Sequence, residues 1–232
     1  MNNAPALLVA QALSRHHDRG AVKALDGVTF EAHAREVVAI TGPSGCGKST
    51  LLSILGLLDQ PTSGRACIEG EDLARVRRPA NFRARNIGFV FQFHHMVSTM
   101  TLLENVAAPM IALGVPRSER RRRASDLLDR MNLSARAHFL PANVSGGERQ
   151  RAAVARALIN RPLIIMADEP TGNLDSRNGQ LVVDLLMEHA LSQNALVLLA
   201  THNPEIARAA HRRIEMRDGQ LVTPACERSS AR

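Results

Sequence analysis

Short runs of apolar residues between turn-forming residues predict a series of strands in the first part of this chain. The expected strands are Ala6–Ala12, Val28–Ala32, Val37–Thr41, Arg65–Ile68 and Ile87–Phe91. A helix is expected at Gly47–Leu58, because Pro61-Thr62-Ser63-Gly64 is a turn cluster that stops it.

From about Phe93 to Asn160 the spacing of apolar residues becomes helical. Thr101 and Glu104 stand at capping-box spacing and predict a helix start, and Ser118 is expected to cap the next helix. This middle block is therefore predicted to be a helical insertion.

Two continuous apolar runs follow the helical block, at Leu163–Ala167 and Ala195–Ala200. Runs of this kind are typical of strands buried on both faces of a parallel sheet. The helical segment Leu181–Glu188 lies between them and completes a crossover unit, and Arg217–Gln220 is expected to form a hairpin turn. The pattern as a whole predicts an α/β fold.

Composition limits the possible functions without choosing one. The chain has 232 residues, of which 45% are hydrophobic, enough for one large core or one core with a satellite subdomain. The net charge of +7 permits contact with nucleic acid or anionic lipid, but a solvated basic surface is the favoured interpretation. With six Phe and no Trp or Tyr, the chain lacks the aromatic faces on which single-stranded bases stack.

No apolar window reaches the length of about eighteen residues that a membrane helix needs. If this protein acts at a membrane, we expect another chain to supply the passage. The cysteines are scattered and predict neither a zinc site nor a disulfide framework. His94 and His95 are adjacent and would face opposite ways in an extended segment, so no metal pair is expected there.

A phosphate-binding loop begins directly after the strand Val37–Thr41. Residues 42–49 match the pattern G-x-x-x-x-G-K-S/T between a strand and a helix. The glycines let backbone N–H groups approach phosphate oxygens, and the helix start adds partial positive charge. Lys48 is expected to reach the β- and γ-phosphates, and the Ser49 hydroxyl to ligate Mg²⁺. The expected ATP contacts are Gly42, Pro43, Ser44, Gly45, Cys46, Gly47, Lys48, Ser49 and Thr50.

Polar residues stand at the ends of three predicted strands. Asp168 and Glu169 end one strand, Thr201-His202 follow the next, and Gln92 ends Ile87–Phe91. The carboxyl ends of parallel strands meet at one edge, where ligands bind in open α/β folds. Asp168 suits Mg²⁺, Glu169 the general base that activates water, and His202 contact with the γ-phosphate. Gln92 is placed to sense Mg²⁺ and the attacking water.

A second phosphate-binding segment lies at Ser145-Gly146-Gly147-Glu148. Together with the phosphate loop, Gln92, Asp168-Glu169, Asn173-Leu174-Asp175 and His202, in this order, it resembles the ATP-binding cassette (ABC) ATPase family along nearly the whole chain. The resemblance implies a P-loop NTPase fold with a RecA-like parallel-sheet core, an antiparallel β subdomain and a helical subdomain. It implies one ABC ATPase domain over residues 1–232. About 1–92 and 160–226 would form the core with the β subdomain, and about 93–159 the helical subdomain.

The resemblance also implies an assembly. In this family the Ser145-Gly146-Gly147-Glu148 segment contacts ATP held by the phosphate loop of a second ATPase subunit, so a head-to-tail homodimer is expected in the ATP state. Integral membrane permease subunits are the expected further partners, and nucleic acid is not. The cofactors implied are ATP and Mg²⁺, and the implied location is peripheral, on the cytoplasmic face of the bacterial inner membrane.

The chain departs from the family pattern at three positions. Val144 replaces the usual Leu of the signature, and Arg35 replaces the usual Gly before Glu36, which puts that turn in question. The family stacks adenine on an aromatic, typically Tyr; the matching position here is His17, with His16 beside it.

A closer resemblance is to the ATPase subunits of bacterial lipoprotein-releasing complexes. It rests on residues 91–96, 101–106, 167–178 and 215–219. Macrolide-export ATPases share most of these motifs, and cell-division relatives that signal through their ATP state keep them as well. ABC ATPases that act on DNA or ribosomes fit less well, because no coiled coil, zinc module or second cassette is present.

Overall fold

A computed structural model describes residues 5–17, 22–172 and 174–222 of the chain. Its strands are β1 (Leu8–His17), β2 (Val22–Ala32), β3 (Val37–Thr41), β4 (Ser63–Ile68), β5 (Glu71–Asp72), β6 (Ile87–Val90), β7 (Ile164–Asp168), β8 (Leu196–Ala200), β9 (Arg212–Arg217) and β10 (Gln220–Leu221). Its α-helices are α1 (Lys48–Leu55), α2 (Pro79–Asn86), α3 (Leu102–Ala107), α4 (Arg117–Arg130), α5 (Gly146–Leu158), α6 (Ser176–Ser192) and α7 (Pro204–Ala209).

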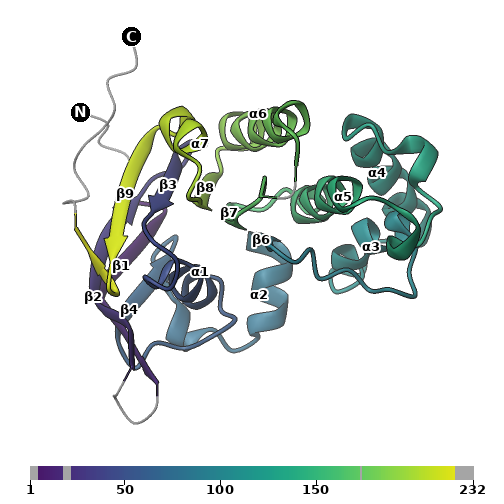
Figure 1. Cartoon of the computed structure of the whole chain (residues 1–232). Helices are drawn as coiled ribbons and strands as arrows, with labels where there is room; N and C mark the ends of the chain where they lie inside the picture. Colours follow the sequence, from purple (N-terminus) through teal and green to yellow (C-terminus); the bar gives the residue numbers. More distant parts are fainter. Residues whose placement is uncertain (1–4, 18–21, 173, 223–232) are drawn as a thin grey trace.

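The central element of the described chain is a six-stranded sheet in the order β10-β9-β3-β8-β7-β6 (Figure 1). β3 pairs in parallel with β8 and β9, and β7 pairs in parallel with β8 and β6. Every residue of β8 is buried, as expected for a strand covered on both faces. The predicted α/β class with a parallel sheet is confirmed, and β9 and β10 form the predicted hairpin.

A second, antiparallel sheet has the order β2-β1-β4-β5. The predicted strands Ala6–Ala12 and Val28–Ala32 are too short, because β1 continues to His17 and β2 begins at Val22. Ladder hydrogen bonds between the two strands extend the pairing into polar residues that the apolar pattern does not mark.

Each face of the six-stranded sheet carries its own hydrophobic core. Along β3, Val37 and Ala39 face one core and Val38 and Ile40 face the other, which is the period of two that a strand imposes. The first core is completed by residues from α3 to α7, and the second by α1 and the antiparallel sheet. Figure 1 shows the two groups of elements on opposite sides of the sheet.

The middle of the chain is helical, as predicted, and the capping box at the start of α3 is present. Thr101 Oγ1 accepts from the Glu104 N–H at 3.2 Å, and Glu104 Oε2 accepts from the Thr101 N–H at 2.9 Å. The predicted Ser118 cap is wrong. α4 begins at Arg117 after Pro116, so Ser118 lies inside the first turn. The helical block shares one core with the sheet, and its boundaries at 93 and 159 remain predictions.

One predicted helix end needs correction, and one helix was missed. The first helix ends at Leu55 rather than Leu58, because Leu57 takes a left-handed φ of 57°. α2 was not predicted at all; none of its residues is fully buried, so it shows no apolar stripe in the sequence.

Arg35 occupies a position that favours glycine. Its φ is 63°, and its N–H donates to the Ala195 carbonyl at 2.9 Å, which ties the turn before β3 to the residue before β8. The left-handed conformation costs a non-glycine residue about 1 kcal/mol. The turn is therefore built without the usual glycine, at a cost that the surrounding structure offsets.

In the part of the chain that the structure describes, no helix combines the length and the apolar character needed to cross a bilayer.

Candidate functional site

The phosphate loop follows β3 and leads into α1. Gly42 and Gly47 have φ values of 145° and 104°, which L side chains rarely adopt. A Cβ at Gly42 would lie 2.1 Å from the Met216 carbonyl oxygen, and one at Gly47 would lie 2.3 Å from that of Ala24. No side chain caps the start of α1. Close backbone packing thus requires these glycines, and it presents the first N–H groups of α1 to an anion.

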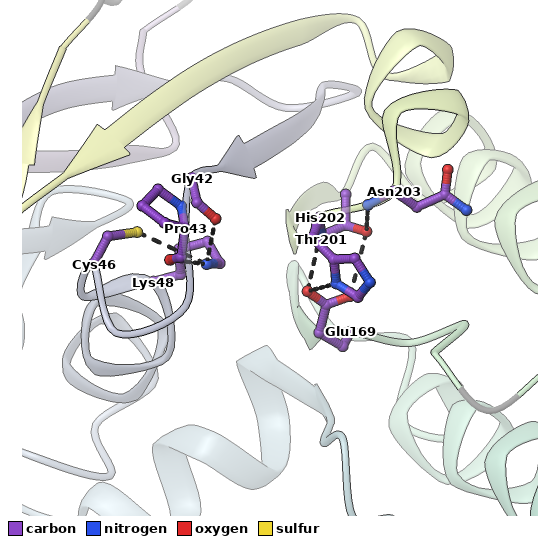
Figure 2. Close-up of polar contacts among 8 residues, drawn as sticks. All are labelled: Gly42, Pro43, Cys46, Lys48, Glu169, Thr201, His202 and Asn203. Atoms are coloured by element: carbon purple, nitrogen blue, oxygen red, sulfur yellow. Dashed lines mark hydrogen bonds and ion pairs between the residues drawn. The ribbon is translucent and has the colours of Figure 1, made fainter.

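Lys48 is the first residue of α1, and its ammonium lies inside the loop. Its Nζ donates to the carbonyls of Gly42 and Pro43 at 2.8 and 2.9 Å and lies 3.7 Å from Cys46 Sγ (Figure 2). An ammonium has three N–H donors. A phosphate that approaches Lys48 must therefore displace at least one of these contacts, and the loop carbonyls hold the side chain in place until then.

Asp168, the last residue of β7, accepts a hydrogen bond from the Ser49 hydroxyl. Burial raises the pKa of Asp168 above its ordinary value and the charge of Glu169 adds to this, although the Ser49 hydrogen bond and Lys48 act in the opposite direction. Ser49 of α1 and Asp168 of β7, the two oxygen ligands predicted for Mg²⁺, thus lie close together in the structure. Hard oxygen donors of this kind suit Mg²⁺, which binds through one or two carboxylates together with substrate phosphates.

Glu169 follows β7 in a left-handed conformation, with φ at 48°. Its N–H donates to the Ala200 carbonyl at 2.9 Å, which fixes it against the end of β8. Its Oε1 lies 2.8 Å from His202 Nδ1 and accepts from the His202 N–H at 3.0 Å (Figure 2). The Glu169 side chain is 11% exposed and that of His202 is 77% exposed. A largely buried carboxylate thus has a solvent-facing imidazole beside it.

Sequence reasoning missed the part that Thr201 plays beside Glu169. Thr201 is fully buried, and its hydroxyl donates to Glu169 Oε2 at 3.4 Å while it accepts from the Asn203 N–H at 3.0 Å. Asn203 in turn caps α7 by accepting from the Glu205 N–H. The signal in the sequence was Asn203-Pro204. A capping residue followed by proline at the first helical position predicts the start of a helix directly after Thr201-His202.

Gln92 lies two residues beyond the end of β6, and β6 is the edge strand beside β7. Its side chain is exposed. The parallel pairing of β6 with β7 places the Gln92 segment at the edge that also carries Asp168. Its role with Mg²⁺ and water remains a prediction.

Ser145 is the N-cap of α5 and forms a capping box with Glu148. The Ser145 hydroxyl oxygen accepts from the Glu148 N–H at 3.2 Å, and Glu148 Oε2 accepts from the Ser145 N–H at 2.8 Å. The Ser145 backbone hydrogen bond lowers the pKa of Glu148, which also contacts Arg136 at 3.2 Å. The spacing Ser-x-x-Glu was visible in the sequence. Because the cap uses an oxygen lone pair, the Ser145 O–H can still donate to a ligand.

The two phosphate-binding segments occupy different parts of the molecule. α5 packs on α3, α4, α6 and β6, whereas α1 packs on β2, β7 and β8. Figure 1 shows α5 grouped with α3 and α4, away from α1. A single chain therefore does not place the start of α5 over its own phosphate loop.

The remaining predicted residues are only partly described. The His17 backbone ends β1 and pairs with Val22 of β2, the strand whose Ala24 and Leu25 pack against Gly47. Contact of His17 with adenine remains a prediction. Asn173 lies outside the described residues. Asp175 caps α6 by accepting from the Asn178 N–H at 2.8 Å.

The histidine pair does not lie in an extended segment. His94 and His95 both have left-handed φ values, 60° and 44°, so the segment is a tight turn and the reason for expecting them on opposite faces does not apply. Among the described residues, no group of three or more His, Cys, Asp or Glu side chains is placed to hold a metal ion.

Comparison with known proteins gives one family and several close relatives. A family profile described as ABC transporter matches residues 25–172. An uncharacterised ABC transporter ATP-binding protein of Thermotoga maritima is 49% identical over 88% of this chain and 89% of its own length. The lipoprotein-releasing system ATP-binding protein LolD of Shewanella oneidensis is 44% identical over 94% of this chain and 96% of its own length. The macrolide export ATP-binding/permease protein MacB of Brucella melitensis is 46% identical over 92% of this chain but only 33% of its own length.

Solved structures agree with the fold. A dimeric ATP-binding cassette in a post-hydrolysis state, bound to ADP and Pi, has a TM-score of 0.91 and 35% identity, covering 97% of this chain and all of that chain. A dimeric bacterial ABC transporter cassette has a TM-score of 0.89 and 36% identity, covering 93% of this chain and 97% of that chain.

Proposed function

Because this chain belongs to the ABC transporter family, we propose that it is the ATPase subunit that drives release of lipoproteins from a bacterial inner membrane for transfer to the outer membrane. The chain is an ATP-binding, ATP-hydrolysing ABC transporter domain. The observation that carries the proposed chemistry is Glu169, held between His202 and Thr201 at the same end of the parallel strands as the phosphate loop.

In the proposed mechanism, the backbone of the phosphate loop and Lys48 bind the phosphates of ATP. Glu169 accepts the proton of a water molecule as the water oxygen attacks the γ-phosphorus. The bond between the γ-phosphorus and the bridging oxygen breaks, and ADP leaves with the electron pair. His202 orients the Glu169 carboxylate and reaches the γ-phosphate from the same edge, and Gln92 positions the water. We assign these roles by placement.

Ser49 and Asp168 are the residues of this chain that would hold Mg²⁺, and Gln92 is the further predicted ligand. The hydroxyl and carboxylate are already in contact, and the donor set fits the ion. When bound, Mg²⁺ neutralises phosphate charge. The half-buried Asp168 carboxylate must remain ionised for this role, although its surroundings raise its pKa.

Asp168→Asn is expected to make the metal-free protein more stable at neutral pH and to abolish Mg²⁺-dependent ATP turnover. A raised pKa means that the folded protein binds the Asp168 proton more tightly than the unfolded chain does. The destabilisation is thus absent below the ordinary value of 3.8 and fully present above the folded-state pKa. Thermal unfolding at pH 7 should therefore show a higher melting temperature than that of the wild-type protein.

The exposed helix residue Asp184 supplies the control for that experiment, because Asp184→Asn removes a solvated carboxylate. We expect this variant to change neither the melting temperature nor turnover. A lower melting temperature for Asp168→Asn would contradict the buried-charge argument.

We further propose that the chain acts as a head-to-tail homodimer with permease subunits, at the cytoplasmic face of the inner membrane, and not on nucleic acid. The separation of α1 from α5 within one chain supports the dimer, as do the dimeric relatives. The helical block of residues 93–159 is the proposed helical subdomain.

Lipoprotein release is placed ahead of macrolide export because the segment Phe93-His94-His95 resembles the lipoprotein-releasing ATPases. The LolD relative is 44% identical over 94% of this chain. Macrolide export remains the second candidate, because identity to MacB is as high over the shared part.

The test is to express the chain with permease candidates and reconstitute any complex that co-purifies into liposomes containing an acylated lipoprotein. The proposal expects co-purification with a four-span permease that bears a large periplasmic domain, and ATP-dependent release of the lipoprotein. Turnover stimulated by a macrolide, without lipoprotein release, would favour export. Salt-sensitive binding to nucleic acid without a membrane partner would overturn both.

A further inference from the structure

The segment that carries Gln92 is folded into a strained turn. We call residues 91–101, between β6 and α3, the Gln92 loop. His94 and His95 are successive non-glycine residues with φ values of 60° and 44°, and the His95 N–H donates to the Phe93 carbonyl at 2.6 Å. Each left-handed residue costs about 1 kcal/mol, and a three-residue turn of this kind is rare. Such a conformation persists only where surrounding groups hold it.

Arg156, near the end of α5, holds this turn. Its Nη1 donates to the His95 carbonyl at 2.6 Å, and its Nη2 donates to the His94 carbonyl at 2.5 Å. Arg156 is half-buried, and this burial lowers the pKa of its guanidinium. Two charge-assisted hydrogen bonds offset that desolvation. The planar guanidinium fork presents two N–H donors in a fixed geometry, one to each of these successive carbonyls.

The electrostatic surroundings of His94 place its ring near the beginning of α5. The pKa of His94 is lowered mainly by burial and then by the charge of Arg149, whereas the Gly146 backbone acts to raise it. The His94 ring thus lies near the first turn of α5, and the His94 carbonyl is held by Arg156 about three helical turns further on. The loop lies along the helix rather than touching it at one point.

The rest of the Gln92 loop is fixed to α3 by Asn105, which is 1% exposed. Asn105 Oδ1 accepts from the Val97 N–H at 2.8 Å, and Nδ2 lies within 3.0 Å of the Val97 and Met100 carbonyls. The half of the loop nearer Gln92 has the Arg156 contacts instead. A displacement of α5 is therefore transmitted to that half.

We propose that Arg156 is a positioning residue that couples α5 to the Gln92 loop, so that Ser145 in one ATP site and Gln92 in the other move together. The inference rests on the proposed function, in which Ser145 contacts ATP on the second subunit and Gln92 contacts it within the chain. α5 is one continuous helix from Gly146 to Leu158, which makes it a rigid link between the two.

The test compares Arg156→Gln and Arg156→Lys in the full chain. Without nucleotide, backbone amide exchange over residues 92–96 should become roughly tenfold faster in Arg156→Gln, because the turn loses its support. With Mg²⁺ and ATP, kcat should fall about tenfold while the dissociation constant of ATP changes less than about twofold, because the phosphate loop is untouched. Arg156→Lys keeps the charge and has three N–H donors but loses the planar fork, and intermediate values are expected.

Arg151 is the matched control on the same helix. It is buried and donates to the Met131 carbonyl at 3.0 Å and to Asn178 Oδ1 at 2.8 Å, with no part in the Gln92 loop contacts described. Arg151→Lys should leave amide exchange over residues 92–96 unchanged, even where it lowers the melting temperature. If Arg151→Lys accelerates amide exchange over residues 92–96 as much as Arg156→Gln does, Arg156 has only a general structural role. That result would overturn the inference.

Two further outcomes would overturn the proposal: unchanged loop exchange in Arg156→Gln, or faster exchange with kcat unchanged. If Arg156→Gln does not fold, Arg156→Lys carries the same comparison. Failure of the proposed function is visible separately, because the wild-type chain would then form no ATP-dependent dimer, whereas loop exchange is measured without ATP.

Discussion

Glu169→Gln is expected to reduce steady-state ATP turnover by roughly a hundredfold or more while ATP binding is retained. The Glu169 carboxylate is held in place by hydrogen bonds with His202 and Thr201 at the ends of the strands. It is largely shielded from water. Glutamine has the same shape and can accept one of these hydrogen bonds. It cannot take up a proton, and so the attacking water is not activated.

The readouts are phosphate release and size-exclusion chromatography with ATP. We expect the variant to accumulate as an ATP-bound dimer that the wild-type protein forms only transiently. Glu188→Gln is the matched control, since Glu188 is an exposed partner of Arg130 at 2.7 Å; it should hydrolyse ATP normally. Wild-type turnover by Glu169→Gln would mean that Glu169 is not the base.

A mixture of two inactive chains is expected to recover activity if the ATP sites are shared. Ser145→Arg should block contact with the partner's ATP while its own Lys48 loop still binds nucleotide. Lys48→Ala has the opposite defect. A mixed dimer contains one site with both defects and one intact site, so random mixing should restore about a quarter of wild-type turnover.

The variant Thr101→Arg tests whether Ser145→Arg is inactive merely because a helix cap is lost. Thr101 caps α3 with the same capping box that Ser145 forms on α5. Loss of the cap should cost about 1 kcal/mol of stability. We expect Thr101→Arg to remain active alone. If the two inactive chains fold, mix and still show no turnover, the shared-site arrangement is wrong.

The local parts of the site were predictable from sequence because they depend on near neighbours in the chain. Gly42 and Gly47 mark backbone conformations that other residues rarely adopt, and the run before Asp168 marks a buried strand. The capping boxes at Thr101 and Ser145 are also local, although only the first was recognised. α2 escaped prediction because it presents no buried stripe.

The contacts between distant segments could not be predicted in this way. Thr201 meets Glu169 because parallel pairing of β7 with β8 brings their ends together in a fixed register. Arg156 meets the carbonyls of His94 and His95 because α5 packs beside β6. Basic side chains on a helix are common, and nothing in the spacing of Arg156 marks it for this contact.

The sequence by itself determined which residues form the phosphate loop, which strand carries the acids and that Ser145-Gly146-Gly147 lies in the helical block. These follow from backbone sterics, apolar periodicity and capping, which act over a few residues. Only the tertiary structure decided that Glu169 lies between Thr201 and His202, that α5 lies apart from α1, and that Arg156 supports the Gln92 loop. Those arrangements depend on sheet register and helix packing between segments far apart in the chain, which the local pattern does not encode.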